Sequence, residues 1–201
     1  MKFRIFNINF EITFLFVALI TFVIVMGSPF NVLAAILSSL AHETGHLMTM
    51  SCLGNIPQCV RFEITGMNIK RQPSVRISAK HEIFIALGGP LANAIILLIC
   101  CVFLCFIQSE EMFTIACVNL ILMTFNLLPV KRLDGGMALY FLLLKKFSSH
   151  ICARNLKITS IFFIILIYVW GIYVFVSTNY NISVLIIAIF LTLSMLGSNE
   201  Y

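Results

Sequence analysis

Six long apolar runs, each nearly free of charged residues, divide the amino-acid sequence. They are residues 12–27, 30–50, 83–107, 112–144, 158–178 and 182–197. A helix needs roughly 20 apolar residues to cross the hydrocarbon core of a bilayer, so runs of this length are expected for membrane spans. The fourth run is interrupted near residues 129–136. The pattern predicts six transmembrane helices in a single integral membrane domain over residues 1–201.

A short stretch between the second and third runs follows a different pattern. Val60, Phe62 and Ile64 alternate with polar residues, and Gly66 separates them from a second short stretch. Alternation with a period of two around a turn residue predicts a small β-hairpin within residues 59–70. The expected fold class is therefore an all-α polytopic membrane protein with a β-hairpin at the cytoplasmic membrane face.

The composition excludes a soluble domain. Of the 201 residues, 61% are hydrophobic and 10% are charged, and the mean hydropathy is +1.05. Soluble domains carry about 25% charged residues, so this chain has too few polar side chains to cover a water-facing surface.

Lys2 and Arg4 before the first run also fit a signal peptide. The run is long and lacks an Ala-x-Ala cleavage site, which favours a retained helix.

The positive charges predict the orientation. All thirteen Lys and Arg residues fall at positions 2–4, 61–80 and 131–157, and the other three connections contain none. Because Lys and Arg collect on the cytoplasmic side, we expect a multi-pass cell-membrane protein with both termini in the cytoplasm. The net charge of +5 then reflects membrane topology, and no nucleic-acid partner is expected.

The second run carries three ionisable residues, in the sequence His42-Glu43-Thr44-Gly45-His46, or HExxH. Histidines at this spacing share one face of a helix and can bind one Zn²⁺, while Glu43, about 100° away, can reach a metal-bound water. A charged side chain at the bilayer centre costs about 2.5–3.5 kcal/mol, so a chance pattern is the weaker alternative. We expect zinc ligation by His42 and His46.

A catalytic zinc commonly has three protein ligands, so one more is required. The candidates are Glu63, His81, Glu82, Asp134 and His150. Asp134 lies at the same expected depth as His46, beyond the interruption at Pro129, whereas three of the others lie at loop edges. Asp134 is therefore favoured, and the alternative for it is an ion pair with Lys131 or Arg132.

Three further residues each allow two interpretations. Gly89 and Asn93 lie in the sequence GGPLAN near the start of the third run, and Asn126 lies eight residues before Asp134. Asn126 could donate a hydrogen bond to a developing oxyanion, or it could bond to a neighbouring helix. Gly89 and Asn93 could take part directly in catalysis, or they could allow close helix packing.

These motifs resemble those of the site-2 proteases, which are intramembrane zinc metalloproteases. Three blocks carry the resemblance: HETGH, GGPLAN, and NLLP followed by LDGG. It covers about residues 1–144, and the last two spans are similar to the six-helix layout of the sporulation branch. The resemblance implies the fold of this family and one bound Zn²⁺ per chain. We expect the protein to lie in a bacterial cell membrane.

The resemblance also implies roles for individual residues. His42, His46 and Asp134 would bind the zinc, and Glu43 would be the general base. Asn126 matches the asparagine that the family assigns to oxyanion or substrate contact, and Gly89 with Asn93 matches the family's G-x-x-x-N element.

The sequence departs from the family pattern in three ways. Val130-Lys131-Arg132 precedes LDG, where apolar and proline residues are common, and Met137 stands where a basic residue or histidine is frequent. No CBS or PDZ domain is expected. These departures concern substrate gating and nucleotide sensing rather than the zinc chemistry.

The expected function is hydrolysis of a peptide bond in a membrane-spanning or membrane-tethered protein, as in the release of a transcription factor or the cleavage of an anti-sigma factor. The expected partners are this substrate, a membrane regulator and the lipid bilayer. One alternative is a protease that trims prenylated C-termini, but no intramembrane glutamate follows Glu43 as a third ligand. The other is a metal-ion transporter or a catalytically silent scaffold, and a transporter would carry ionisable residues along several spans.

Overall fold

The computed structural model describes residues 2–5, 8–12, 28–54, 59–63, 66–70, 78–178 and 180–196. The chain forms two compact units, one over Met1–Phe125 and the other over Asn126–Tyr201. Except for its first residue, the predicted span at residues 12–27 lies outside the described residues.

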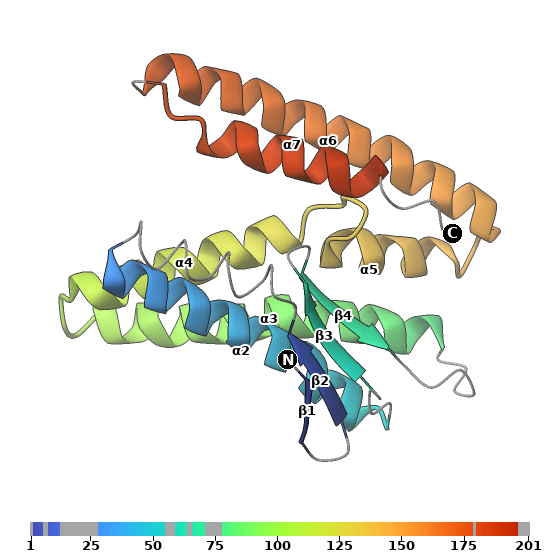
Figure 1. The fold of residues 1–201 in the computed structure, drawn as a ribbon, viewed down its shortest axis with the longest axis horizontal. Helices are drawn as coiled ribbons and strands as arrows, with labels where there is room; N and C mark the ends of the chain where they lie inside the picture. The colour runs from blue at the N-terminus through green and yellow to red at the C-terminus, as the bar shows by residue number, and fades with distance from the viewer. Residues whose placement is uncertain are drawn as a thin grey trace. The chain divides into compact units, whose positions relative to one another are not determined.

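The described residues form six helices and four strands (Figure 1). The helices are α2 (Pro29–Cys52), α3 (Ala79–Leu104), α4 (Glu110–Asn126), α5 (Asp134–Leu143), α6 (Ser149–Ser177) and α7 (Ser183–Leu196). The strands are β1 (Lys2–Ile5), β2 (Ile8–Ile12), β3 (Cys59–Glu63) and β4 (Gly66–Lys70). Five of the six predicted spans thus coincide with helices, and the interrupted fourth span comprises both α4 and α5.

The strands form one sheet in the order β1-β2-β3-β4. β2 pairs in parallel with β3, and the other two pairings are antiparallel. Cys59 is opposite Lys70 and Glu63 is opposite Gly66, while residues 64–65 between them lie outside the described part of the chain. The alternating stretch therefore contributes two strands to a larger sheet rather than standing alone as a hairpin, because β2 supplies β3 with a second neighbour.

In the first unit, α2 packs closely against α3. A Cβ atom on Gly88 of α3 would lie 2.8 Å from the carbonyl oxygen of Gly45 in α2 and 2.5 Å from Thr49 Oγ1. A Cβ atom on Gly45 would meet the Gly88 carbonyl oxygen at a similarly forbidden distance. Small residues let two apolar helices approach backbone to backbone. The crossing brings the buried face of α2, which carries His42 and His46, against α3.

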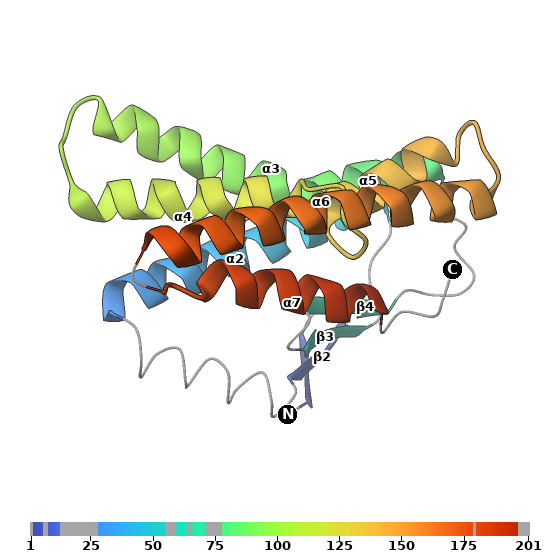
Figure 2. The same ribbon diagram turned by 90° about the horizontal axis from the view of Figure 1, so that it is seen from above.

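The second unit contains α5, α6 and α7. Helices α6 and α7 lie side by side (Figure 2), and the hydroxyls of Tyr168 and Thr192 are 3.3 Å apart between them. Helix α5 packs on α6 through a small core of Tyr140, Cys152 and Leu156. The unit is therefore held together by its own apolar contacts.

The break between α4 and α5 spans residues 127–133, slightly earlier than the interval near 129–136 expected from the sequence. Pro129 lacks an N–H and disfavours helical conformation in the residue before it, so α4 ends at Asn126. The Lys131 N–H donates to Ser160 Oγ of α6 at 2.8 Å, and Arg132 has a positive φ of 76°. Asp134 consequently begins a helix instead of lying within the irregular stretch.

Two of the described helices, α3 and α6, are long and apolar enough to cross a membrane. Large apolar side chains on both are exposed, including Leu98, Phe162 and Trp170. Exposed apolar surface on this scale would be costly in water and is expected for helices in contact with lipid.

Replacing Gly45 with alanine should force α2 and α3 apart, since the new methyl group would collide with the backbone of α3. We expect Gly45→Ala to lower the free energy of unfolding by about 1–3 kcal/mol, the usual cost of overpacking. Denaturant unfolding in detergent micelles measures this. Ser39→Ala, an exposed position on the same helix, is the matched control and should stay within about 0.5 kcal/mol of wild type.

Candidate metal centre

His42 and His46 lie one turn apart on the buried face of α2, with 5% and 8% of their surfaces exposed. Their Nε2 atoms are 3.2 Å apart, and the two rings meet edge to face at 80°. Two nitrogen ligands at about 2.0–2.1 Å from one tetrahedral Zn²⁺ lie about 3.3 Å apart. The spacing of the two nitrogens therefore suits a shared zinc ion.

The opposite nitrogens of both rings are bonded to α3. His46 Nδ1 lies 2.7 Å from the carbonyl oxygen of Ile85, and His42 Nδ1 lies 2.5 Å from Asn93 Oδ1. A carbonyl oxygen can only accept, so His46 Nδ1 carries the proton and its Nε2 keeps a lone pair. The Gly89 N–H also points at His46 Nδ1, at 3.3 Å, but the shorter contact to Ile85 decides the tautomer. Such bonds from the distal nitrogen orient metal-binding histidines.

Gly89 leaves room in front of the two Nε2 atoms. A Cβ atom at this position would lie 2.6 Å from His42 Nε2 and closer still to His46 Nε2. Any side chain at Gly89 would therefore fill the space in which the imidazoles converge. The open space and the two nitrogen donors both fit a metal ion. The short distances from a Cβ atom at Gly89 also show that this residue lies directly against the two histidines.

Asn93 is fully buried, and its amide is already used inside the protein. Its Nδ2 donates to the Ser38 carbonyl oxygen at 3.2 Å and to Asn119 Oδ1 at 2.8 Å. Asn119 on α4, also fully buried, donates in turn to Ser38 Oγ at 2.9 Å. Sequence reasoning did not select Asn119 or Ser38. The sequence feature that could have identified them is a polar residue within an apolar run, which often marks a hydrogen bond between membrane helices.

The other predicted site residues occupy helix positions. Glu43 is partly buried on α2, next to His42, and Asn126 is the partly buried last residue of α4. Asp134, also partly buried, is the first residue of α5, where a helix N-terminus favours negative charge.

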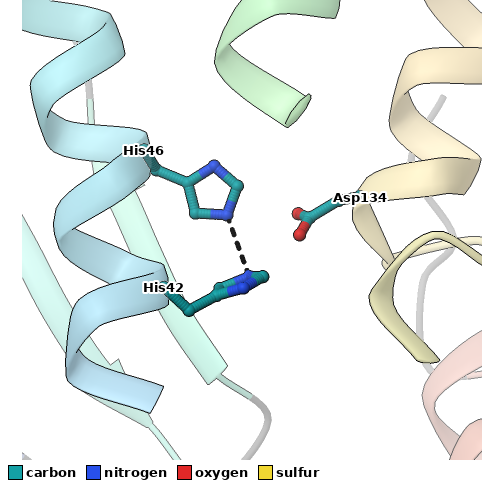
Figure 3. Close-up of side chains that lie close together, drawn as sticks. All are labelled: His42, His46 and Asp134. Carbon is teal, nitrogen blue, oxygen red and sulfur yellow. Dashed lines mark hydrogen bonds between the residues drawn. The ribbon is translucent and has the colours of Figure 1, made fainter. Parts of the chain in front are cut away.

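Among the described residues, one group of three side chains could hold a metal ion: His42, His46 and Asp134. One ligand atom from each lies within 4.8 Å of the others, and Figure 3 shows the carboxylate facing the two imidazoles. His81, Glu82 and His150, the alternative third ligands that the structure describes, are not in the group. The side chain of Glu63 lies outside the described part of the chain.

Comparison with solved structures finds the site-2 protease from Methanocaldococcus jannaschii. The match has a TM-score of 0.72 and 20% sequence identity, and it covers 100% of this chain and 95% of that one. The chain has the site-2 protease fold. The likeness extends beyond the motif-bearing part to the last two helices. No family model and no curated protein matches the sequence.

The site-2 protease fold and the His-His-Asp cluster are together consistent with an integral membrane zinc metallopeptidase. The fold match at 20% identity leaves the branch of the family as a prediction.

Replacing Gly89 with alanine should abolish tight metal binding, because the methyl group would occupy the space between the two Nε2 atoms. We expect zinc affinity to fall at least about 100-fold, beyond the range usual for losses outside the ligands themselves. Competition with a fluorescent chelator measures this. Gly171→Ala, whose methyl group would meet only the movable Leu185 side chain and its backbone at longer range, should retain wild-type affinity.

Proposed function

We propose that this protein is an intramembrane zinc metalloprotease that hydrolyses a peptide bond in a membrane-spanning or membrane-tethered protein. One observation carries the proposal: two buried histidines on a site-2 protease fold, with Nε2 atoms 3.2 Å apart and both Nδ1 atoms bonded to α3. Neutral imidazoles held in this way are ready-made zinc ligands.

His42, His46 and Asp134 would hold one Zn²⁺ per chain. Two nitrogens and one carboxylate oxygen form a ligand set typical of catalytic zinc, which leaves one position open. When bound, zinc supplies a water whose pKa is lowered towards about 7 and a positive charge that polarises the scissile carbonyl. Asp134 would also be compensated for its partial burial by ligation.

Glu43 is proposed as the general base. It follows His42 on α2, so its carboxylate projects about 100° around the helix from that ligand and can approach the open position without filling it. Glu43 would take a proton from the attacking water and return it to the leaving amine. Asn126 is proposed to donate its amide N–H to the developing oxyanion.

The substrate would be a protein segment within or beside the bilayer. A helical substrate hides its carbonyls in internal hydrogen bonds, so the segment must unwind locally before a peptide bond can be attacked. The distribution of Lys and Arg supports a topology with both termini in the cytoplasm and the metal centre near that side. We propose regulated intramembrane proteolysis, in which a membrane partner controls cleavage, as the physiological setting.

Loss of the general base should abolish proteolysis and leave the metal in place. We expect Glu43→Gln to reduce cleavage of a co-expressed, tagged and membrane-tethered substrate about 10²- to 10⁴-fold, the usual contribution of acid–base catalysis. Immunoblotting of the products measures this. Full cleavage by the variant would contradict the mechanism, and zinc flux into proteoliposomes that persists in Glu43→Gln would favour a transporter instead.

Loss of a ligand should remove both the metal and the activity. Elemental analysis of purified protein should find about one zinc per chain, as a single catalytic site requires. We expect His46→Ala and Asp134→Asn to lose this zinc after dialysis against a weak chelator. His150→Ala, which removes a histidine at the exposed start of α6, is the matched control and should keep it. Retention of zinc by Asp134→Asn would refute its assignment as the third ligand.

A further inference from the structure

A chain of hydrogen bonds runs from His42 into the space between α2, α3 and α4. It passes from His42 Nδ1 to Asn93 of α3 and then to Asn119 of α4, whose Nδ2 returns to Ser38 Oγ of α2. Asn93 and Asn119 are both fully buried, and Ser38 is 4% exposed. Buried polar side chains are expensive unless every hydrogen bond is made, and here two amides and one hydroxyl lie together on three neighbouring helices.

The backbone determines which way each amide points. Asn119 Nδ2 donates to the carbonyl oxygen of Ile115 at 2.9 Å, and this oxygen can only accept. Asn119 must therefore present Oδ1, not Nδ2, to Asn93 at 2.8 Å. The Ser38 carbonyl oxygen imposes the same choice on Asn93, whose Nδ2 lies 3.2 Å from it. Two separate acceptors thus hold the Asn93 amide in one orientation.

This orientation selects one tautomer of His42. With Nδ2 bonded to Ser38 and Asn119, Asn93 turns Oδ1 towards His42 Nδ1, which must carry the proton. The lone pair then resides on Nε2, the atom that faces His46. A reversed Asn93 amide would donate to Nδ1 and move the proton to Nε2, where it would block a metal.

We propose that Asn119 is a positioning residue for the metal centre: through Asn93 it holds His42 as the tautomer that binds metal through Nε2. The proposal rests on the proposed zinc function and assigns a role to α4 in it. Asn93 acts in the same relay, as the direct partner of the imidazole. The acceptor oxygen of Asn119 is the group that matters, so a side chain of the same shape without that oxygen should fail.

The test compares two substitutions of nearly equal size in the full-length protein in detergent. Asn119→Leu removes the oxygen that receives Asn93 Nδ2, whereas Asn119→Asp keeps that oxygen and, as the neutral acid that burial favours, can donate its O–H to the Ile115 carbonyl in place of Nδ2. We expect Asn119→Leu to bind zinc about 10- to 100-fold more weakly, as is usual when a ligand loses its orienting partner, and Asn119→Asp to stay within about threefold of wild type. Chelator competition measures the affinities. Thr124→Val on the same helix, whose hydroxyl bonds only to α4 carbonyls, should bind normally.

A second measurement needs no metal. In zinc-free protein labelled with ¹⁵N-histidine, NMR should show the His42 proton on Nδ1 in wild type and in Asn119→Asp, and a mixture of tautomers in Asn119→Leu. Wild-type affinity and tautomer in a folded Asn119→Leu would overturn this inference. Should the leucine variant not fold, Asn119→Ala decides between the same outcomes. Absence of zinc binding by wild type would instead overturn the proposed function, and the NMR result would still test the relay.

Discussion

The backbone-to-backbone crossing of α2 and α3 is the constraint on which the candidate metal centre depends. Gly45 and Gly88 bring the two helices so close that side chains of α2 reach main-chain and side-chain acceptors of α3. A wider crossing would move His46 away from the Ile85 carbonyl and leave a buried imidazole N–H unpaired. The close packing of α2 on α3 is therefore also what orients the imidazole of His46.

Each buried amide and imidazole at this site has neighbours that allow only one assignment of its donor and acceptor atoms. Carbonyl oxygens of Ser38, Ile85 and Ile115 accept, and these acceptors dictate the amide and imidazole orientations between them. In a low-dielectric interior an unmade bond is costly, so alternative orientations are strongly disfavoured. The consequence is a pair of imidazoles whose orientation the protein fixes by itself, which would lower the cost of ordering them as ligands of the proposed metal ion.

The second unit positions Asp134 through contacts within the unit. Pro129 ends α4 early, the Lys131 N–H is held by Ser160 of α6, and the chain re-enters a helix at Asp134. Proline and paired glycines in the sequence predict an interruption here. They do not predict that Asp134 begins a helix, because where a helix restarts depends on the contacts that the break makes with α6.

The sequence by itself determined the membrane character, five of the six predicted spans and the likeness to site-2 proteases, since apolar runs and the HExxH spacing act through local periodicity. It also placed His42 and His46 on one face, because residues four apart on a helix must lie there. Only the tertiary structure decided that Gly89 clears space for the imidazoles and that Asn93 and Asn119 orient one of them. Those contacts join residues on different helices, and no local pattern encodes which buried amide will meet which histidine.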